Sequence, residues 1–123
     1  MLFRSNPTDA HPVFASRMKR RLRQGARLIV VDPRRIDLVR QPHIEAEFHL
    51  ALRPGTNVAV LNAMAHVIVS EGLSKDDYVQ QRCDLPEFEK WRQFIVQPRN
   101  SPEAIEEATG VPAAAIQIGR AHV

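Results

Sequence analysis

The most constraining feature of this sequence is a short apolar run that ends in an aspartate and a proline. Residues 28–31 read Leu-Ile-Val-Val, and Asp32-Pro33 follows directly. A continuous run of this length, rich in β-branched residues, is typical of a strand buried on both faces, and such strands occur in parallel sheets. Pro33 cannot donate a hydrogen bond to a sheet, so it ends the strand. We therefore expect an α/β fold in which Asp32 lies at the carboxyl end of a parallel strand.

Hydrophobic spacing predicts the elements around this strand. Residues 43–50 alternate between polar and apolar side chains, which indicates a second strand. Helical spacing is found over residues 12–24 and again over residues 56–71. We expect residues 1–72 to form a partial α/β domain and residues 73–117 to form a helical extension. The helix starts expected in that extension are Ser74, Pro86, Ser101 and Pro112.

The charge of the chain is unevenly distributed. The 123 residues have a formal net charge of +3. Residues 1–40 hold ten Lys or Arg against three Asp or Glu, whereas residues 41–123 hold seven against eleven. The basic first third indicates an anionic partner or, alternatively, a solvated helix face. A basic nucleic-acid-binding module is one reading, although the chain has one Trp, one Tyr and no recognisable nucleic-acid motif.

Cysteine and hydropathy exclude several other classes of protein. Cys83 is the only cysteine, so the chain has neither an internal disulfide nor a metal site built from several cysteines. Its polar surroundings, without a paired His motif, favour a structural role. No apolar run approaches the roughly 18 residues of a membrane helix, and residues 1–6 do not resemble a secretory signal. We expect a cytoplasmic location without membrane contact, and we assign no catalytic or metal-ligating residue.

The first candidate binding loop precedes the helix that begins at Pro12. Side chains of Asn6, Thr8 and Asp9 can brace this loop through hydrogen bonds to the backbone, and His11 completes it. Backbone N–H groups at a helix start are unsatisfied and favour an anion. A loop that only caps its helix is the alternative.

Two further loops are expected at the same edge of the sheet. Ligands of open α/β sheets lie beyond the carboxyl strand ends, where Asp32 can accept ribose hydroxyls and Arg34 can pair with a phosphate. A second turn at residues 54–57 contains a glycine and opens the next helix. Convergence of the three loops predicts a nucleotide site, but without the G-x-G-x-x-G fingerprint of nicotinamide cofactors. The candidate cofactor-binding residues are Asn6, Thr8, Asp9, His11, Asp32, Pro33, Arg34, Gly55, Thr56 and Asn57.

Three strings carry a family resemblance. They are Ser-Asn-Pro-Thr-Asp-Ala-His-Pro at residues 5–12, Leu-Ile-Val-Val-Asp-Pro-Arg-Arg at 28–35 and Leu-Arg-Pro-Gly-Thr-Asn at 52–57. In this order and spacing they resemble the molybdopterin-guanine-dinucleotide oxidoreductases, which include formate dehydrogenases, periplasmic-type nitrate reductases and dimethyl-sulfoxide reductase. Residues 78–91 and 101–112 look most like the catalytic α subunit of NAD-dependent molybdenum formate dehydrogenases.

The resemblance implies an internal piece of a larger subunit. Its partial Rossmann-like, parallel-sheet domain would bind one guanine dinucleotide of a bis-molybdopterin cofactor that carries molybdenum or tungsten. Residues 6–11 would approach the pyrophosphate, Asp32 would meet the guanosine ribose with Arg34 beside it, and residues 55–57 would lie near the nucleotide end. The complete enzyme would oxidise formate to CO2 and pass electrons to NAD through β and γ subunits with iron–sulfur and flavin centres. Nitrate reductase is the alternative within the family.

The resemblance also concerns the two ends of the chain. It implies that the metal-ligating residue and the iron–sulfur cysteines lie upstream, and that only residues 1–3 of the first strand remain. Residues 118–123 read Ile-Gly-Arg-Ala-His-Val, a hexapeptide that a common sequencing adapter can encode. We expect these six residues to be a non-native tail.

Overall fold

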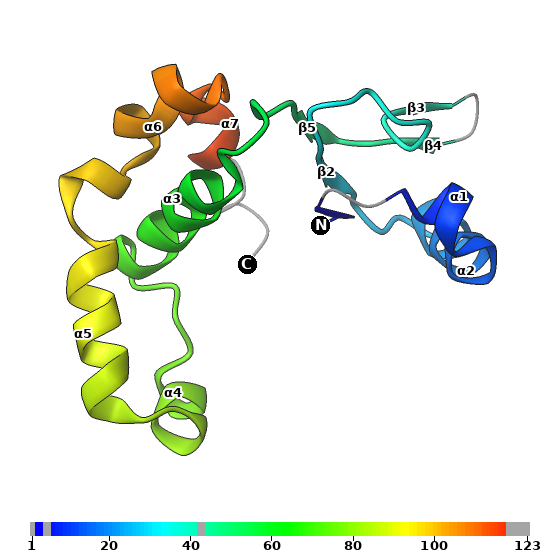
Figure 1. The fold of residues 1–123 in the computed structure, drawn as a ribbon. Coiled ribbons are helices and arrows are strands. Elements are labelled where there is room, and N and C mark those ends of the chain that lie inside the picture. The colour runs from blue at the N-terminus through cyan, green and yellow to red at the C-terminus, as the bar shows by residue number, and fades with distance from the viewer. Residues whose placement is uncertain (1, 4–5, 42–43, 118–123) are drawn as a thin grey trace. The chain divides into compact units, whose positions relative to one another are not determined.

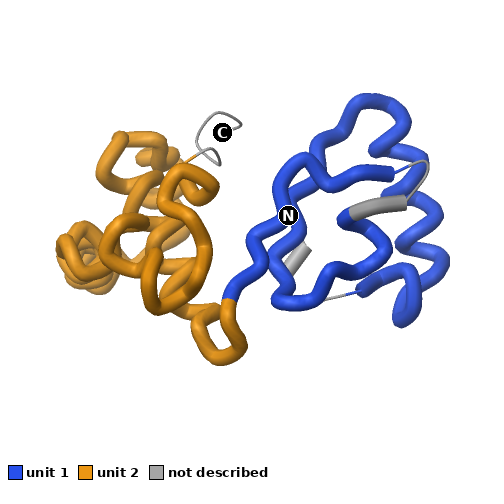
Figure 2. The backbone as a smooth tube through the Cα atoms, turned by 90° about the horizontal axis from the view of Figure 1, so that it is seen from above, with its two compact units in different colours: residues 1–52 blue, residues 53–123 orange. Residues whose placement is uncertain are grey.

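The computed structural model describes residues 2–3, 6–41 and 44–117. The chain forms two compact units, residues 1–52 and residues 53–123 (Figure 2). The division falls at residue 52, whereas the sequence led us to expect it near residue 72. The expected non-native tail at 118–123 lies outside the described residues.

The first unit contains short strands and two helices (Figure 1). In chain order they are β1 (Leu2–Phe3), α1 (Pro7–Ala10), α2 (Pro12–Arg23), β2 (Ile29–Val31), β3 (Arg40–Gln41), β4 (Ile44–Glu45) and β5 (Phe48–Leu50). Helix α2 confirms the helix expected from Pro12 onwards. The turn-rich segment before it was expected to be a loop, but residues 7–10 form the short helix α1, which Pro7 opens at a position where its missing N–H has no cost.

Strand β2 is the centre of a three-stranded parallel sheet. It pairs with β1 on one edge and with β5 on the other. Val30 lies opposite Leu2 and His49, and both Val30 and Val31 are fully buried. The α/β class and the doubly covered strand are therefore confirmed. Leu2–Phe3 supplies a parallel partner although β1 is only two residues long.

The strand expected over residues 43–50 is divided in two. Strand β4 pairs antiparallel with β3, whereas β5 pairs parallel with β2. Between them, the N–H of Ala46 donates to the carbonyl of Val39 and the N–H of Glu47 donates to that of Leu28. The chain thus changes its hydrogen-bonding neighbour at residues 46–47. The prediction of one continuous strand over residues 43–50 was therefore wrong. His43, at the start of the expected strand, lies outside the described residues.

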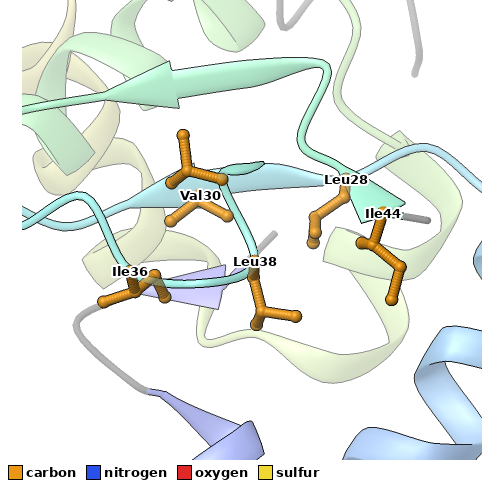
Figure 3. Packing of buried hydrophobic residues seen from close by; sticks show 6 residues of the cluster. Leu28, Val30, Ile36, Leu38 and Ile44 are labelled. Carbon is orange, nitrogen blue, oxygen red and sulfur yellow. The ribbon is translucent and has the colours of Figure 1, made fainter. Parts of the chain in front are cut away.

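The core of the first unit lies between β2, the connection after it and α2. Figure 3 shows its main members, which are Leu28, Val30, Ile36, Leu38 and Ile44. Met18 and Leu22 of α2 pack against this cluster. Of the apolar residues that follow helical spacing in α2, Met18 and Leu22 therefore lie toward the core, whereas Val13 and Phe14 are exposed.

The second unit is helical. Its elements are α3 (Asn57–Ser70), α4 (Asp76–Arg82), α5 (Leu85–Ile95), the 3-10 helix η1 (Pro98–Asn100), α6 (Pro102–Thr109) and α7 (Ala113–Gln117). Helix α3 packs against α5, α6, α7 and η1, so it belongs to this unit rather than to the sheet. No described helix of either unit is both long enough and apolar enough to cross a membrane.

Two helix starts expected from the sequence have different outcomes. The Ser101 hydroxyl accepts the N–H of Ala104 at 3.2 Å, so Ser101 caps α6 as predicted. Helix α6 ends at Gly110, whose φ of +71° lies in the left-handed region. The cap predicted at Ser74 is wrong, because α4 begins at Asp76 and the Ser74 hydroxyl contacts the Asp76 carboxylate instead.

Thr109, at the end of α6, provides a test of the second unit. Its fully buried hydroxyl donates to the Ile105 carbonyl at 2.8 Å and accepts the Val111 N–H at 3.2 Å. Thr109→Val keeps the volume but leaves the Val111 N–H without an acceptor. We expect the free energy of unfolding to fall by about 1–3 kcal/mol in urea titrations. Amide exchange at Val111 should accelerate in Thr109→Val and stay slow in Thr109→Ser; equal exchange in both variants would contradict the role of the hydroxyl.

Candidate functional site

The candidate site begins at the carboxyl end of β2 with a buried carboxylate. Asp32 is 1 % exposed, and its Oδ1 accepts the Arg34 N–H at 2.8 Å and the Arg34 Nε at 3.1 Å. Its Oδ2 accepts Arg34 Nη2 at 3.3 Å. Burying a carboxylate is costly unless it is paired and hydrogen-bonded, and Arg34 meets both conditions. Pro33 between them forms the turn that brings the guanidinium back over the carboxylate.

The Arg34 side chain is hydrogen-bonded to Asp32 and is otherwise exposed to solvent. Its hydrogen bond to Asp32, and then the charges of Asp32 and Asp9, raise the pKa of Arg34 above its ordinary value. The side chain remains 70 % exposed. The sheet edge therefore carries a permanent cation whose position is set by a buried partner, which suits an anionic or planar ligand group.

His49 adds a contact that the sequence analysis missed. Its Nε2 donates to the main-chain carbonyl of Asp32 at 2.9 Å, from a half-buried position on β5. In the alternation of residues 43–50, His49 belongs to the polar set, for which we expect an exposed strand face. The signal that could have found it is the parallel register, which sets His49 opposite Val30, two residues before Asp32.

The first loop is braced by its own side chains. Asn6 donates through Nδ2 to the Asp9 carboxylate and accepts the Thr8 hydroxyl through Oδ1. These bonds join side chains, whereas bonds from these side chains to the backbone were expected. His11 is exposed and precedes the first turn of α2. The charge of Asp9 contributes to the raised pKa of Arg34, and the meeting of this loop with the end of β2 stays a prediction.

The third loop lies in the second unit. Gly55 has a φ of +88°, and a Cβ there would meet no atom within 4 Å, so the backbone is strained for other residues but open to close approach. The Thr56 hydroxyl donates to the Arg53 carbonyl at 2.7 Å. Asn57 Oδ1 is buried and has no hydrogen-bond partner among the described residues. Meeting of this loop with the other two stays a prediction.

Arg53, which the sequence analysis did not single out, ties the third loop to α6. Its N–H donates to the Thr109 carbonyl at 2.8 Å, and its guanidinium donates to the carbonyls of Glu107 and Ala108. These carbonyls belong to the last turn of α6, where the helix has no internal donor for them and the dipole favours a cation. The turn at residues 54–57 is thus fastened at its start.

The groups in these loops are suited to binding a ligand. They offer a fixed guanidinium, a buried amide oxygen and a helix start, which suit phosphate, ribose and base groups. Among the described residues, no group of three or more His, Cys, Asp or Glu could hold a metal ion. Cys83 is exposed and ends α4, away from these loops in the sequence.

Comparison with known proteins gives the family. The sequence model of the molybdopterin oxidoreductases matches residues 1–121. The chain is 40 % identical over 116 residues to formate dehydrogenase H of Escherichia coli and 35 % identical over 117 residues to the periplasmic nitrate reductase of Desulfovibrio desulfuricans. These alignments cover 94 % and 88 % of the chain and 15 % of each relative.

A third sequence and a solved structure agree with this result. The α subunit of the F420-dependent formate dehydrogenase of Methanocaldococcus jannaschii is 34 % identical over 111 residues, which is 90 % of the chain and 15 % of that subunit. Acetylene hydratase from Pelobacter acetylenicus superposes with a TM-score of 0.74 at 30 % identity, over 85 % of this chain and 13 % of that one. The chain therefore spans about 15 % of the length of the curated relatives named here, and it belongs to the molybdopterin oxidoreductase family.

Proposed function

We propose that this chain is the part of a formate dehydrogenase α subunit that binds a molybdopterin guanine dinucleotide. The observation that carries the proposal is the Asp32–Arg34 pair, a cation fixed by a buried carboxylate at the carboxyl edge of a parallel sheet. In open α/β sheets this edge is the place where nucleotides bind. Family membership supports a molybdopterin group, and two of the relatives named above are formate dehydrogenases.

Several groups of the described residues would suit such a dinucleotide. Arg34 would pair with phosphate or stack on the base through its exposed side. In the second unit, the buried Oδ1 of Asn57 has no hydrogen-bond partner among the described residues and would accept an N–H group of the nucleotide. Asp32 would accept ribose hydroxyls only by sharing the oxygens that Arg34 now occupies. The segment from Asn6 to His11 would lie along the pyrophosphate.

In the complete enzyme the cofactor, with molybdenum or tungsten, would supply the two-electron oxidation of formate to CO2. The contribution of this chain would be to bind and orient the cofactor, without catalytic or metal-ligating residues of its own. Its partners would be the rest of the α subunit and the β and γ subunits, which carry electrons through iron–sulfur and flavin centres to NAD. We place this enzyme in the cytoplasm.

Nitrate reduction is the second candidate, because the periplasmic nitrate reductase aligns with this chain nearly as well. The test is the activity of the longer subunit that contains this sequence, purified with its cofactor. Formate-dependent reduction of benzyl viologen without nitrate reduction by reduced viologen supports the proposal. Nitrate reduction without formate oxidation would replace it.

Removal of Asp32 gives a direct test of the cofactor site. In the cofactor-loaded subunit, Asp32→Ala leaves Arg34 without its anchor and removes the acceptor for ribose hydroxyls. We expect cofactor affinity to fall by about 1–3 kcal/mol, or about 5- to 150-fold. The measurement is the GMP released per subunit by acid hydrolysis after extended dialysis.

The matched control is Asp37→Ala, which removes an exposed carboxylate from the connection after β2. It should keep the original GMP content. A second pair of variants separates the effect of the fixed Arg34 cation from the effect of net charge. Arg34→Ala should lower the retention of the cofactor, whereas Arg35→Ala, at an exposed neighbour, should not. Full GMP content in both Asp32→Ala and Arg34→Ala would show that the site lies elsewhere.

Substitution of Cys83 tests our expectation that the metal ligand lies in another part of the subunit. The thiol is exposed at the end of α4, and no cluster of ligand side chains surrounds it in the described residues. Cys83→Ser should therefore leave formate oxidation within about threefold of the original, a change of less than about 1 kcal/mol in barrier. Loss of bound molybdenum from a folded Cys83→Ser subunit, measured by elemental analysis, would refute the assignment.

A further inference from the structure

The main-chain carbonyl of Asp32 is held by a side chain from the neighbouring strand. His49 Nε2 lies 2.9 Å from this oxygen, and because a carbonyl can only accept, Nε2 carries the proton in the contact. The ring belongs to β5, which pairs in parallel with β2 and sets His49 opposite Val30. The hydrogen bond therefore reaches along the sheet, to a residue beyond Val31, where the pairing of β2 with β5 ends.

The main chain of β5 turns away from β2 at the same level. Leu50 lies opposite Val31 at the end of the paired register. Two residues later, the N–H of Leu52 donates back to the Leu50 carbonyl at 3.0 Å, so this N–H is directed to its own strand. The imidazole of His49 thus extends the hydrogen bonding between the two strands by a side-chain contact.

The carbonyl that His49 contacts belongs to the peptide bond between Asp32 and Pro33. This peptide is planar and the φ of proline is fixed, so the two together determine where the main chain of Arg34 begins. From there the Arg34 N–H donates to Asp32 Oδ1 at 2.8 Å, and the guanidinium donates to the two carboxylate oxygens at 3.1 and 3.3 Å. Holding the carbonyl therefore restrains the turn that brings the guanidinium back to the carboxylate.

A half-buried histidine can also stabilise a fold without serving a binding site. His66 of α3 makes a similar contact in the second unit, because its Nδ1 lies 2.8 Å from the Ile95 carbonyl at the end of α5. Ile95 is far in sequence from every candidate cofactor-binding residue. The acceptor of His49, by contrast, is part of the turn that carries Arg34. The place of the acceptor in the chain is what distinguishes the two histidines.

We propose that His49 is a positioning residue for the cation that would bind the cofactor. Its ring holds the peptide after β2, so that the Asp32 carboxylate and the Arg34 guanidinium keep one geometry for a phosphate or a base. The ring acts through Arg34 rather than by a contact of its own with the ligand. This inference deepens the proposed function and rests on it, because the dinucleotide is the ligand that Arg34 would bind.

The test uses the complete cofactor-loaded subunit that contains this sequence and follows its GMP content during dialysis. His49→Leu removes the donor, and we expect the cofactor to dissociate about 2- to 12-fold faster. His49→Gln should retain the cofactor as the original subunit does, because its amide Nε2 can donate from a similar distance along the side chain. The matched control is His66→Leu, which removes a comparable hydrogen bond from the second unit and should leave the dissociation rate unchanged.

A double variant separates positioning from general stabilisation of the fold. If His49 acts through Arg34, then adding His49→Leu to Arg34→Ala should make dissociation no faster than Arg34→Ala alone. Additive effects would overturn the inference, because His49 would then act independently of Arg34. If His49→Leu does not fold, His49→Asn replaces it in every comparison, since its amide is one methylene too short to reach the carbonyl.

The single variants distinguish failure of this inference from failure of the proposed function. Normal retention in His49→Leu with loss of cofactor in Arg34→Ala would overturn the role of His49 and leave the proposed function standing. Loss of cofactor in His49→Gln equal to that in His49→Leu would also overturn it, because the donor would then not be what matters. Normal retention in Arg34→Ala would overturn the cofactor site itself and the inference with it.

Discussion

The first unit depends on the pairing of β2 with a parallel strand on each edge. Its residues are buried on both faces, so the strand is stable only when β1 and β5 flank it and α2 and the following connection cover it. The same pairing sets the position of everything that follows β2. Asp32 is held where the strand ends, and β5 brings His49 to its main-chain carbonyl.

The Asp32–Arg34 pair shows how burial can position a surface charge. The carboxylate is inside and the guanidinium is largely outside, so the hydrogen bonds and the charge of Arg34 help to offset the cost of burying Asp32. A single exposed arginine would sample many rotamers, and ordering it on a ligand would cost entropy. Here much of that ordering is already present. Arg53 is held at the second unit in a comparable way, by carbonyls at the end of α6.

Helix α2 meets different requirements on its two sides. Ala15 is buried and Met18 and Leu22 pack on the core, while Val13 and Phe14 are exposed. A solvated surface would be satisfied by mixed charges, which stabilise a helix through i, i+4 pairs. Among the described residues, the cations of α2 form no ion pair, and Val13 and Phe14 beside them are exposed.

Features with a local physical cause could be predicted from the sequence. The buried strand at 28–31, the helix that begins at Pro12 and the Ser101 cap each follow from neighbouring residues, and all three are present. The convergence of the loops around Asp9 and Arg34 stays a prediction. The family could be predicted too, because three motifs occur in a fixed order.

Only the tertiary structure decided which segments are neighbours. The alternation over residues 43–50 is real, but Ala46 and Glu47 bond to different segments and divide the strand. Helix α3 was expected in the α/β domain, whose boundary was placed near residue 72, yet it packs with α5 and α6. His49 and Arg53 were overlooked because their partners, the carbonyls of Asp32 and of the last turn of α6, are distant in sequence. Periodicity reports which face of an element is apolar, whereas the partner of that face is chosen by packing between segments far apart in the chain.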